Sequence, residues 1–527
     1  MAETITLNEI QNFKGKYPKQ LWALFFSEMW ERFCFYGMRG MLTYFMVTQL
    51  FMNDRDANLQ YGATQAFVYA FTFIGGLFAD KILGFRRSLF WGGILMIVGS
   101  AILATDPHQF FFLGISFTII GTGFFKPNIS TMVGTLYKKG DNRRDAGFSL
   151  FYAGINIGAL LGGYACIAIG KGELFSSIVP SGSTWNVAFG LAAVVMTISL
   201  VTFLFTQKTL GPIGLPPSGN ENFEEVVSEG IDSKVVPEPV VISQRAMPKK
   251  WYTYAVYIGS LAVIPVIMTM VAKTQYTDYF MYIIGPATLL YLFYEMFKYN
   301  VAERKKLVAA LVFIIFSIIF WGIYEQSGGS LSLFAARNLD NKILGTITLD
   351  PNGVNNSANS LFVIIFAFIF SVIWIGMARK KIEPNTLIKF GLAFLFLSAG
   401  YFIFYTTRFF SNGSGIASLD VFTVAYLAVT FGELCLSPIG LSIMTKLSPK
   451  KLQGVMMGMW FLASAYGQYV AGLLGAGLST ADENDTLQQK LITFTDGYKQ
   501  LAIYALIAGV ILIVISPFVR KLMQEVK

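Results

Sequence analysis

The sequence contains few of the residue types on which most enzymes depend. Among 527 residues there are one histidine and three cysteines. His108 lies in a short polar segment, so we expect it at the surface without a proton-carrying role. Cys34, Cys166 and Cys435 lie in separate apolar stretches without metal-ligand spacing, which predicts ordinary packing and no metal site. With no Ser/His/Asp set or phosphate-binding glycine loop in the sequence, we expect no enzyme, not even a membrane-embedded one.

Charged residues are also scarce, at 13% of the chain, whereas soluble proteins average about 25%. Hydrophobic residues make up 54%. Apolar runs that begin near residues 21, 110, 185, 307, 360, 421 and 501 each reach the roughly 20 residues that cross a bilayer. These runs predict helices, because backbone groups in lipid must pair within their own segment. The polar residues 1–20 do not form a cleavable signal, so we expect the first helix to remain.

The net charge of +9 is spread over short loops, which indicates membrane topology and argues against nucleic-acid binding. The basic loops, which should face the cytoplasm, contain Lys81, Arg86, Arg87, Lys138, Lys139, Arg143, Arg144, Arg304, Lys305, Lys306, Arg379, Lys380, Lys381, Lys446, Lys450, Lys451, Arg520 and Lys521. The alternate, acidic loops contain Asp54, Asp56, Asp106, Asp340, Asp350, Asp420, Asp482, Glu483 and Asp485. We therefore expect a multi-pass inner-membrane protein with both termini in the cytoplasm.

Apolar spans divide the chain into blocks of about six, two and six helices. The first block has spans near 20–50, 60–84, 87–105, 109–137, 145–170 and 184–206. A stretch rich in Pro, Gly and acids predicts a cytoplasmic linker, and the next two spans predict a hairpin near 252–272 and 277–297. The last block has spans near 306–336, 358–378, 386–406, 419–446, 452–478 and 498–520. The predicted domains are a first bundle, the linker, the hairpin and a second bundle, at 1–207, 208–250, 251–298 and 299–527.

Two six-helix blocks in the same orientation are the arrangement of the major facilitator superfamily, in which substrate binds near the middle of the membrane between the halves. We predict an all-α polytopic membrane protein with two six-helix bundles, an extra hairpin and about 14 transmembrane helices. Gly75 and Gly76 support this fold, because small residues let helices approach closely. Asp80, Arg86 and Arg87 follow in a loop where we expect the arginines to stay solvated, although a simple polar turn would also fit.

The first predicted helix carries charges that lipid disfavours. A charge at the bilayer centre costs roughly 2.5–3.5 kcal/mol on insertion scales, so it needs a partner or a wet cavity. Three- and four-residue spacing puts on one face Glu28, Arg32, Tyr36 and Arg39. Glu28 and Glu31 lie within one turn of Arg32, and a carboxylate there can take up a proton when the arginine is drawn to another anion. The face predicts a proton acceptor, and a static ion-pair cluster is the alternative.

Another cation, Lys126, lies near the middle of span 109–137 and precedes Pro127, which kinks the helix. Its candidate partners, Glu325 and Glu433, belong to the second bundle. Ion pairs that form and break as the halves move would give alternating access, which favours a carrier over a channel. Other residues at similar depth complete the predicted cavity: Tyr69, Asn156, Trp321, Asn359, Trp460 and Ser464.

Three motifs resemble those of the proton-coupled oligopeptide transporter family, a branch of the major facilitator superfamily. The helix-one motif is Glu28-x-x-Glu31-Arg32-Phe33-x-x-Tyr36-Gly37. The helix-five motif is Phe151-Tyr152-x-x-Ile155-Asn156-x-Gly158. The helix-ten motif is Gly432-Glu433-Leu434-x-x-Ser437-Pro438-x-Gly440. The resemblance covers the whole chain, and the extra helix pair is similar to that of bacterial members.

This resemblance implies a symporter that imports di- and tripeptides with protons and needs no other cofactor. Arg32 and Lys126 would bind the peptide carboxylate. The amino terminus would be held by Asn156, Asn359 and Glu433. Permissive side-chain pockets would be lined by Tyr36, Tyr69, Trp321, Trp460 and Ser464.

The resemblance also implies roles in proton coupling for Glu28, Glu31, Arg32 and Glu325. Arg39 would face Glu325 as one outer gate, and Lys126 would face Glu433 as a second. Arg39 and Glu325 are also included in the predicted substrate-binding set. Phe35 replaces a tyrosine usual in helix one, which removes a hydroxyl contact to substrate. A carrier of another small anion, either nitrate or a carboxylate-bearing compound, is the alternative within the family. We expect a functional monomer whose partners are small peptides and the lipid bilayer, with no nucleic acid.

Overall fold

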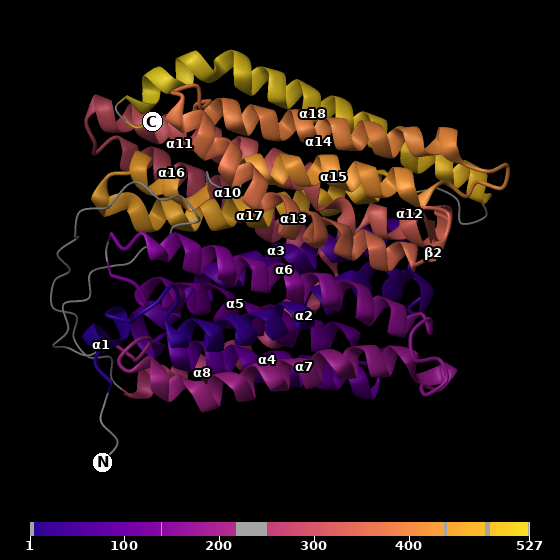
Figure 1. The fold of residues 1–527 in the computed structure, drawn as a ribbon, viewed down its shortest axis with the longest axis horizontal. Helices are drawn as coiled ribbons and strands as arrows, with labels where there is room; N and C mark the ends of the chain where they lie inside the picture. The colour runs from indigo at the N-terminus through magenta and orange to yellow at the C-terminus, as the bar shows by residue number, and fades with distance from the viewer. Residues whose placement is uncertain are drawn as a thin grey trace. The chain divides into compact units, whose positions relative to one another are not determined.

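The computed structural model describes residues 5–138, 140–217, 250–436, 440–479, 485–524 and 526. This part of the chain is helical apart from loops and one small antiparallel hairpin of β1 (Lys342–Ile343) and β2 (Ile347–Thr348), so the predicted all-α class is confirmed (Figure 1). Most of the predicted linker, residues 218–249, lies outside the described residues. So do Lys139, Ser437, Pro438, Asp482 and Glu483.

The six predicted spans of the first block are all present as helices. The elements in chain order are α1 (Leu7–Gln11), α2 (Lys19–Thr48), α3 (Asp54–Phe78), the π-turn η1 (Ala79–Leu83), α4 (Phe85–Thr105), α5 (Phe111–Thr135), α6 (Arg143–Gly170), η2 (Ser181–Ser183), α7 (Thr184–Thr206) and η3 (Gln207–Leu210). The short α1 was not predicted, because it lies in the polar N-terminal segment. Thr6 caps it together with Glu9 in a reciprocal capping box.

The hairpin and the last block contain more helical segments than predicted. They are α8 (Lys250–Ala262), α9 (Ile264–Ala272), α10 (Thr274–Met296), α11 (Val301–Tyr324), η4 (Glu325–Gly328), α12 (Ser330–Asn338), α13 (Pro351–Arg379), α14 (Thr386–Thr406), η5 (Thr407–Phe410), α15 (Leu419–Leu436), α16 (Gly440–Leu447), η6 (Lys450–Leu452), α17 (Gln453–Gly477) and α18 (Leu487–Met523). Pro265 explains the break between α8 and α9, because proline lacks the N–H that a continuous helix would use.

The span predicted near 306–336 is present as one stretch, Val301–Asn338, that is long and apolar enough to cross a membrane. Its helix has a break that the sequence did not predict, because α11 ends at Tyr324 and α12 starts at Ser330. The segment between them contains Gly328 and Gly329. A Cβ on Gly328 would lie 2.2 Å from the ring of Tyr61, so the chain there passes close to α3. Hydropathy is continuous across the break and gave no sign of it.

Ten stretches within the described residues are long and apolar enough to cross a membrane. The other predicted spans are α2, α5, α10 and α17, which are helices of 30, 25, 23 and 25 residues. Charged or polar residues lower the hydropathy of these four. Together the two sets account for the fourteen spans that the sequence predicts.

The chain divides into two compact units, each described here by itself. Unit 1 comprises residues 1–38, 67–162 and 169–272, and unit 2 comprises residues 39–66, 163–168 and 273–527. Unit 2 therefore combines the end of α2, the start of α3 and residues 163–168 of α6 with the C-terminal helices. Within it, α14 packs along α15 and α18, and α11 packs along α17 (Figure 1). The division at 1–207 and 299–527 into two moving bundles stays a prediction.

Glycines allow close helix contacts in both units. In unit 1, a Cβ on Gly75 would lie 2.2 Å from the carbonyl oxygen of Gly123, as the paired glycines predicted. In unit 2, a Cβ on Gly62 would lie 2.6 Å from the Cα of Gly472, so α3 and α17 meet backbone to backbone. The loop after Gly75 differs from the expectation in one respect. Arg86 is only partly solvated, because its guanidinium donates to the carbonyl oxygens of residues 211 and 213 at 2.5 and 2.6 Å.

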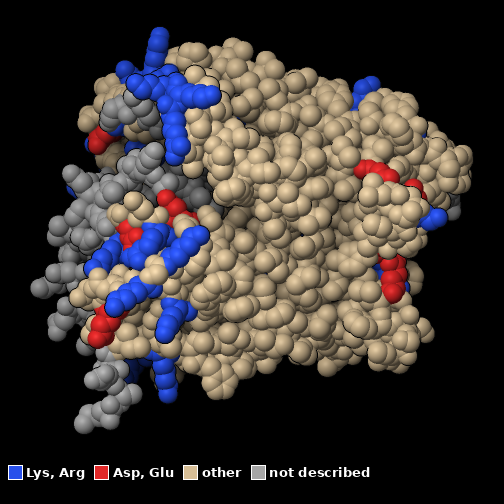
Figure 2. Space-filling view, viewed as in Figure 1, with Lys and Arg blue, Asp and Glu red and all other residues tan. Residues whose placement is uncertain are grey.

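Charge is distributed unevenly along unit 2. On its visible face in Figure 2, Lys and Arg gather at the end where α18 finishes, and Asp and Glu are visible at the opposite end together with a few Lys and Arg. This separation matches the predicted alternation of basic and acidic loops.

Candidate substrate and proton-coupling site

Three charged side chains of α2 form a buried cluster in unit 1. Arg32 Nε lies 3.2 Å from Glu28 Oε1 and also contacts Glu31 Oε2. Glu28, Glu31 and Arg32 are only 2%, 0% and 1% exposed. The predicted ion pairs are therefore present, and they are shielded from solvent.

This cluster retains unused hydrogen-bonding capacity. Glu28 Oε2, Glu31 Oε1 and Arg32 Nη2 have no hydrogen-bond partner among the residues that the structure describes. Burying such atoms unpaired disfavours the folded state, so each would gain from a new partner. Arg32 could bind an anion through Nη2, and a carboxylate could bind a proton. The static ion-pair alternative satisfies the same contacts, so the proton role stays a prediction.

Lys126 on α5 lies near the same cluster. Its Nζ is 4.5 Å from the centroid of the Tyr69 ring and 6.0 Å from that of Phe35. The guanidinium carbon of Arg32 lies 5.3 Å from the same Phe35 ring. Arg32 and Lys126 thus both contact Phe35, the residue at which the helix-one motif departs from the usual tyrosine. A cation–π contact needs only the ring face, so phenylalanine retains this role while losing the hydroxyl.

Asn156 lies on α6 and is 6% exposed, with its amide bound to the carbonyl oxygen of Tyr152 at 2.9 Å. The motif glycine two residues later has a clear structural reason. A Cβ on Gly158 would lie 2.0 Å from the carbonyl oxygen of Met29, so only glycine lets α6 contact α2 beside Arg32. The two motifs therefore pack against each other. Tyr36, also on α2, is half-buried in the same unit.

A second polar cluster lies in unit 2, where α11, α13 and α15 meet. Glu433 accepts hydrogen bonds from Tyr324 Oη at 2.6 Å and from Asn359 Nδ2 at 2.8 Å. Asn359 also donates to Tyr324 Oη at 2.8 Å. The Trp321 ring packs edge-on against Tyr324, with centroids 5.2 Å apart. The structure thus brings together three predicted site residues and adds Tyr324, which was not among the predicted site residues.

Trp460 and Ser464 lie one turn apart on α17, and Ser464 Oγ donates to the carbonyl oxygen of Trp460 at 3.3 Å. This helix packs against the Trp321 side of α11, because a Cβ on Gly467 would lie 2.6 Å from Trp321 Cβ. The tryptophan is 9% exposed. The role of these residues and of Tyr69 in lining side-chain pockets stays a prediction.

The predicted pair of Arg39 and Glu325 is present in unit 2. Arg39 Nη2 binds Glu325 Oε2, and the two side chains are 14% and 6% exposed. Arg39 also donates to Tyr61 Oη at 2.7 Å and to Ser327 Oγ at 3.2 Å. Glu325 starts the short η4 turn, so the break after α11 places its carboxylate toward α2.

A further ion pair in unit 2 was missed. Arg337, at the end of α12, donates to both carboxylate oxygens of Asp54 at the start of α3, with an Nη2 to Oδ1 distance of 2.8 Å. The sequence reasoning used Asp54 only as a topology marker. The signal that could have revealed the pair is Arg337 itself, a cation among acidic loops on the side where the positive-inside rule disfavours it.

The remaining predictions have simple outcomes. His108 is exposed, and Asp106 accepts a hydrogen bond from its backbone N–H, which confirms a surface position. The three cysteines are free and buried, as ordinary packing requires. The predicted pair of Lys126 with Glu433 joins residues of different compact units and stays a prediction.

Comparison with known proteins assigns the family. The family model described as the POT family matches residues 86–491. The peptide transporter YePEPT of Yersinia enterocolitica is 33% identical over 529 residues, with 97% of this chain and 96% of the relative covered. A di-/tripeptide transporter of Lactococcus lactis is 30% identical, with 99% of each chain covered.

Solved structures agree with the sequence comparison. The crystal structure of a peptide transporter POT in complex with sulfate has a TM-score of 0.77 and 30% identity, covering 99% of this chain and 100% of that one. A POT family transporter in complex with a thioalcohol-conjugated peptide has a TM-score of 0.76 and 28% identity, covering 97% and 98%. The motifs on α2, α6 and α15 and these matches lead to one assignment: this chain belongs to the POT family, and it is a multi-pass membrane transporter and not an enzyme.

Proposed function

We propose that this protein is a proton-coupled symporter that imports di- and tripeptides by alternating access. The buried cluster of Glu28, Glu31 and Arg32 is the observation that carries the proposal, because it combines an anion-binding group with carboxylates that can bind a proton. The relatives named peptide transporter and di-/tripeptide transporter support the substrate class. Protons are the only coupling ligand that this chemistry requires.

The peptide carboxylate would bind Arg32 and Lys126, which both contact the Phe35 ring. A guanidinium and an ammonium form charge-assisted hydrogen bonds with a carboxylate, and these are about twice as strong as neutral ones. The peptide amino terminus would bind Glu433 and Asn359, with Asn156 as a further partner. These contacts involve groups that every peptide has, so the side chains of the substrate are left to permissive aromatic walls.

Proton coupling has an energetic basis. A membrane potential of about 100 mV contributes roughly 2.3 kcal/mol for each charge moved inward. A zwitterionic peptide has no net charge, so only a proton carried with it can draw on this potential. Protonation of Glu325 would weaken its ion pair with Arg39, and protonation of Glu28 or Glu31 would release Arg32 for the carboxylate of the peptide.

We place the protein in the bacterial inner membrane, with both termini in the cytoplasm, and assign transport to the monomer. The basic and acidic ends of unit 2 support this orientation (Figure 2). Labelling of single cysteines at the C-terminus in intact and permeabilised cells tests it. To test whether a single chain transports, uptake is measured in liposomes that contain one chain each, with the number of chains counted by fluorescence bleaching.

The test of function is uptake of labelled di- and tripeptides into liposomes under an imposed pH gradient and potential. We expect accumulation that stops when an ionophore dissipates the gradient. E325Q should abolish driven uptake while sparing counterflow exchange of peptide, whereas E383Q should change neither. The control is matched, because Glu383, in the loop before α14, also forms an ion pair in unit 2, with Lys389 of α14. Driven uptake by E325Q at the wild-type rate would contradict the assignment of Glu325.

The alternative substrate within the family is another small anion, either nitrate or a carboxylate-bearing compound. Competition separates the two: excess dipeptide should abolish uptake of a labelled tripeptide, and excess nitrate should leave it unchanged. Inhibition by nitrate in place of dipeptide would favour the alternative.

A further inference from the structure

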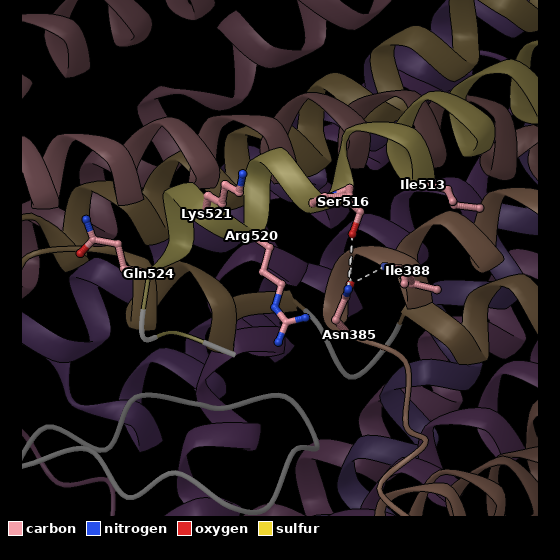
Figure 3. Close-up of a pocket in the computed structure, with 8 residues that line it drawn as sticks. Asn385, Ile388, Ile513, Ser516, Arg520, Lys521 and Gln524 are labelled. Carbon is pink, nitrogen blue, oxygen red and sulfur yellow. Dashed lines mark hydrogen bonds between the residues drawn. The ribbon is translucent and has the colours of Figure 1, made fainter.

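A cavity outside the proposed transport site opens between the start of α14 and the end of α18. Its volume is about 460 Å³ (Figure 3). It is lined by Asn385, Ile388, Ile513, Ser516, Pro517, Arg520, Lys521 and Gln524. The two helices touch just beside it, because a Cβ on Gly391 would lie 2.5 Å from Ile513 Cγ1. The cavity therefore begins one turn from this contact, toward the ends of the helices.

The polar wall of the cavity is structurally fixed at its inner edge. Asn385 caps α14 by accepting from the backbone N–H of Ile388 at 2.9 Å. It also exchanges hydrogen bonds of 3.4 Å with Ser516, whose side chain is 2% exposed. Figure 3 shows these bonds at the base of the cavity. The polar groups at the inner edge are thus already hydrogen-bonded to each other, so polar contacts with a ligand have to come from the cations at the rim.

Two cations, Arg520 and Lys521, lie at the rim. Both are exposed, and neither has an ion-pair partner within the described ranges. In Figure 3 the Arg520 side chain extends from α18 to the side on which Asn385 lies, whereas Lys521 leaves the helix on its other side. A guanidinium in this position offers several N–H donors to a ligand in the cavity, and it matches the oxygens of a phosphate.

The apolar wall indicates what kind of phosphate would fit. Ile388 and Ile513 form the side of the cavity nearest the middle of the helices. The adjacent surface of α18 is apolar and open, with Val514 and Phe518 70% and 66% exposed. An anion bound at Arg520 would therefore lie next to the exposed apolar surface of α18. Contact with an apolar surface does not stabilise a free phosphate, whereas it stabilises a phospholipid through its acyl chains.

The geometry points to a binding site for the phosphate headgroup of an anionic phospholipid, such as phosphatidylglycerol, with Arg520 as its direct cationic partner. Lys521 at the rim would add electrostatic attraction, and the acyl chains would lie along Val514 and Phe518. Basic pockets between transmembrane helices at the cytoplasmic surface bind anionic headgroups by this chemistry. A lipid held there would join the cytoplasmic ends of α14 and α18.

The experiment is native mass spectrometry of the purified full-length protein in detergent with added phosphatidylglycerol, phosphatidylcholine or inorganic phosphate alone. The test variant is R520Q/K521Q. The matched control is R379Q/K380Q, which removes two exposed cations at the end of α13, also in unit 2 but away from the cavity. Thermal unfolding without lipid verifies that both variants are folded.

We expect wild-type protein and the R379Q/K380Q control to bind a first phosphatidylglycerol more tightly than phosphatidylcholine. In R520Q/K521Q this first binding should weaken by about fivefold for each cation removed. Equal losses in both double variants would overturn the site in favour of general surface charge. Equal binding of the two lipids would also overturn it, as would displacement of the lipid by inorganic phosphate alone.

Discussion

Breaking the ion pair of Asp54 with Arg337 should loosen the end of unit 2 that we propose faces outward. The two terminal guanidinium nitrogens of Arg337, Nη1 and Nη2, bind the carboxylate of Asp54. The side chains of Arg337 and Asp54 are 23% and 10% exposed. Exposed pairs contribute about 0.2–1 kcal/mol, and breaking fully buried pairs costs about 3–5 kcal/mol. This pair lies between these limits, so we expect R337Q to favour opening by about 1.5 kcal/mol, which is roughly tenfold in the open population.

A single cysteine can report this opening. Ser330, at the start of α12, is 0% exposed in unit 2, and the three native cysteines are buried. In S330C, a membrane-impermeant maleimide added to intact cells should label only while this end is open. We expect labelling to become about tenfold faster on adding R337Q. D54N should speed labelling to a similar extent. The D54N/R337Q double variant should be labelled at about the same rate as either single variant, because both substitutions remove the same interaction.

The charge swap D54R/R337D should bring labelling back toward the wild-type rate. R408Q is the matched control, because Arg408 pairs with Asp496 in the same unit, and the side chain of Asp496 is 60% exposed. It should leave the labelling rate unchanged. Labelling of R337Q at the wild-type rate, or effects of D54N and R337Q that simply add in the double variant, would refute the reasoning.

Two further substitutions test the packing and the site. G62A should lower the thermal unfolding temperature, because its methyl would lie 2.6 Å from the backbone of Gly472 and overpacking costs about 1–3 kcal/mol. The control is G376A, which should leave the unfolding temperature unchanged because nothing lies within 4 Å of the added methyl. Y324F should raise the apparent KM for dipeptides several-fold in liposome uptake while leaving the fold intact, because it removes the hydroxyl that binds Glu433 at 2.6 Å. An unchanged KM would remove Tyr324 from the site.

The membrane helices and the charged clusters could be predicted because both depend on properties that the sequence displays directly. A charge within an apolar run is conspicuous, and its partner must be another such charge. Charge reasoning alone offered Glu325 as a partner for Lys126, and the resemblance to the oligopeptide transporter family paired it with Arg39. The structure contains the pair of Arg39 and Glu325. Attention to charges within an apolar run also found Glu28, Glu31 and Arg32, since four-residue spacing places Glu28 and Arg32 on one helix face and Glu31 is adjacent to Arg32.

Neutral hydrogen-bonding residues could not be found in this way. The chain has 25 tyrosines, and nothing in the sequence distinguishes Tyr61 and Tyr324, which bind site residues, from the others. Helix breaks and helix starts were missed for a related reason. The first turns of α13 and α18 are polar and are stabilised by the caps Asp350 and Thr486, so hydropathy placed the starts of both helices too late.

The ion pairs Arg39–Glu325 and Asp54–Arg337, which link α2 and α3 to the C-terminal helices of unit 2, have opposite polarity, and this has a consequence for coupling. In one pair the N-terminal part of the chain supplies the cation, Arg39, and in the other it supplies the anion, Asp54. A proton on Glu325 neutralises only the first pair, and Arg39 would still donate to Tyr61 and Ser327. The second pair would remain ionised, so protonation alone should not open this end completely. Peptide or potential must contribute the rest, as obligatory symport requires.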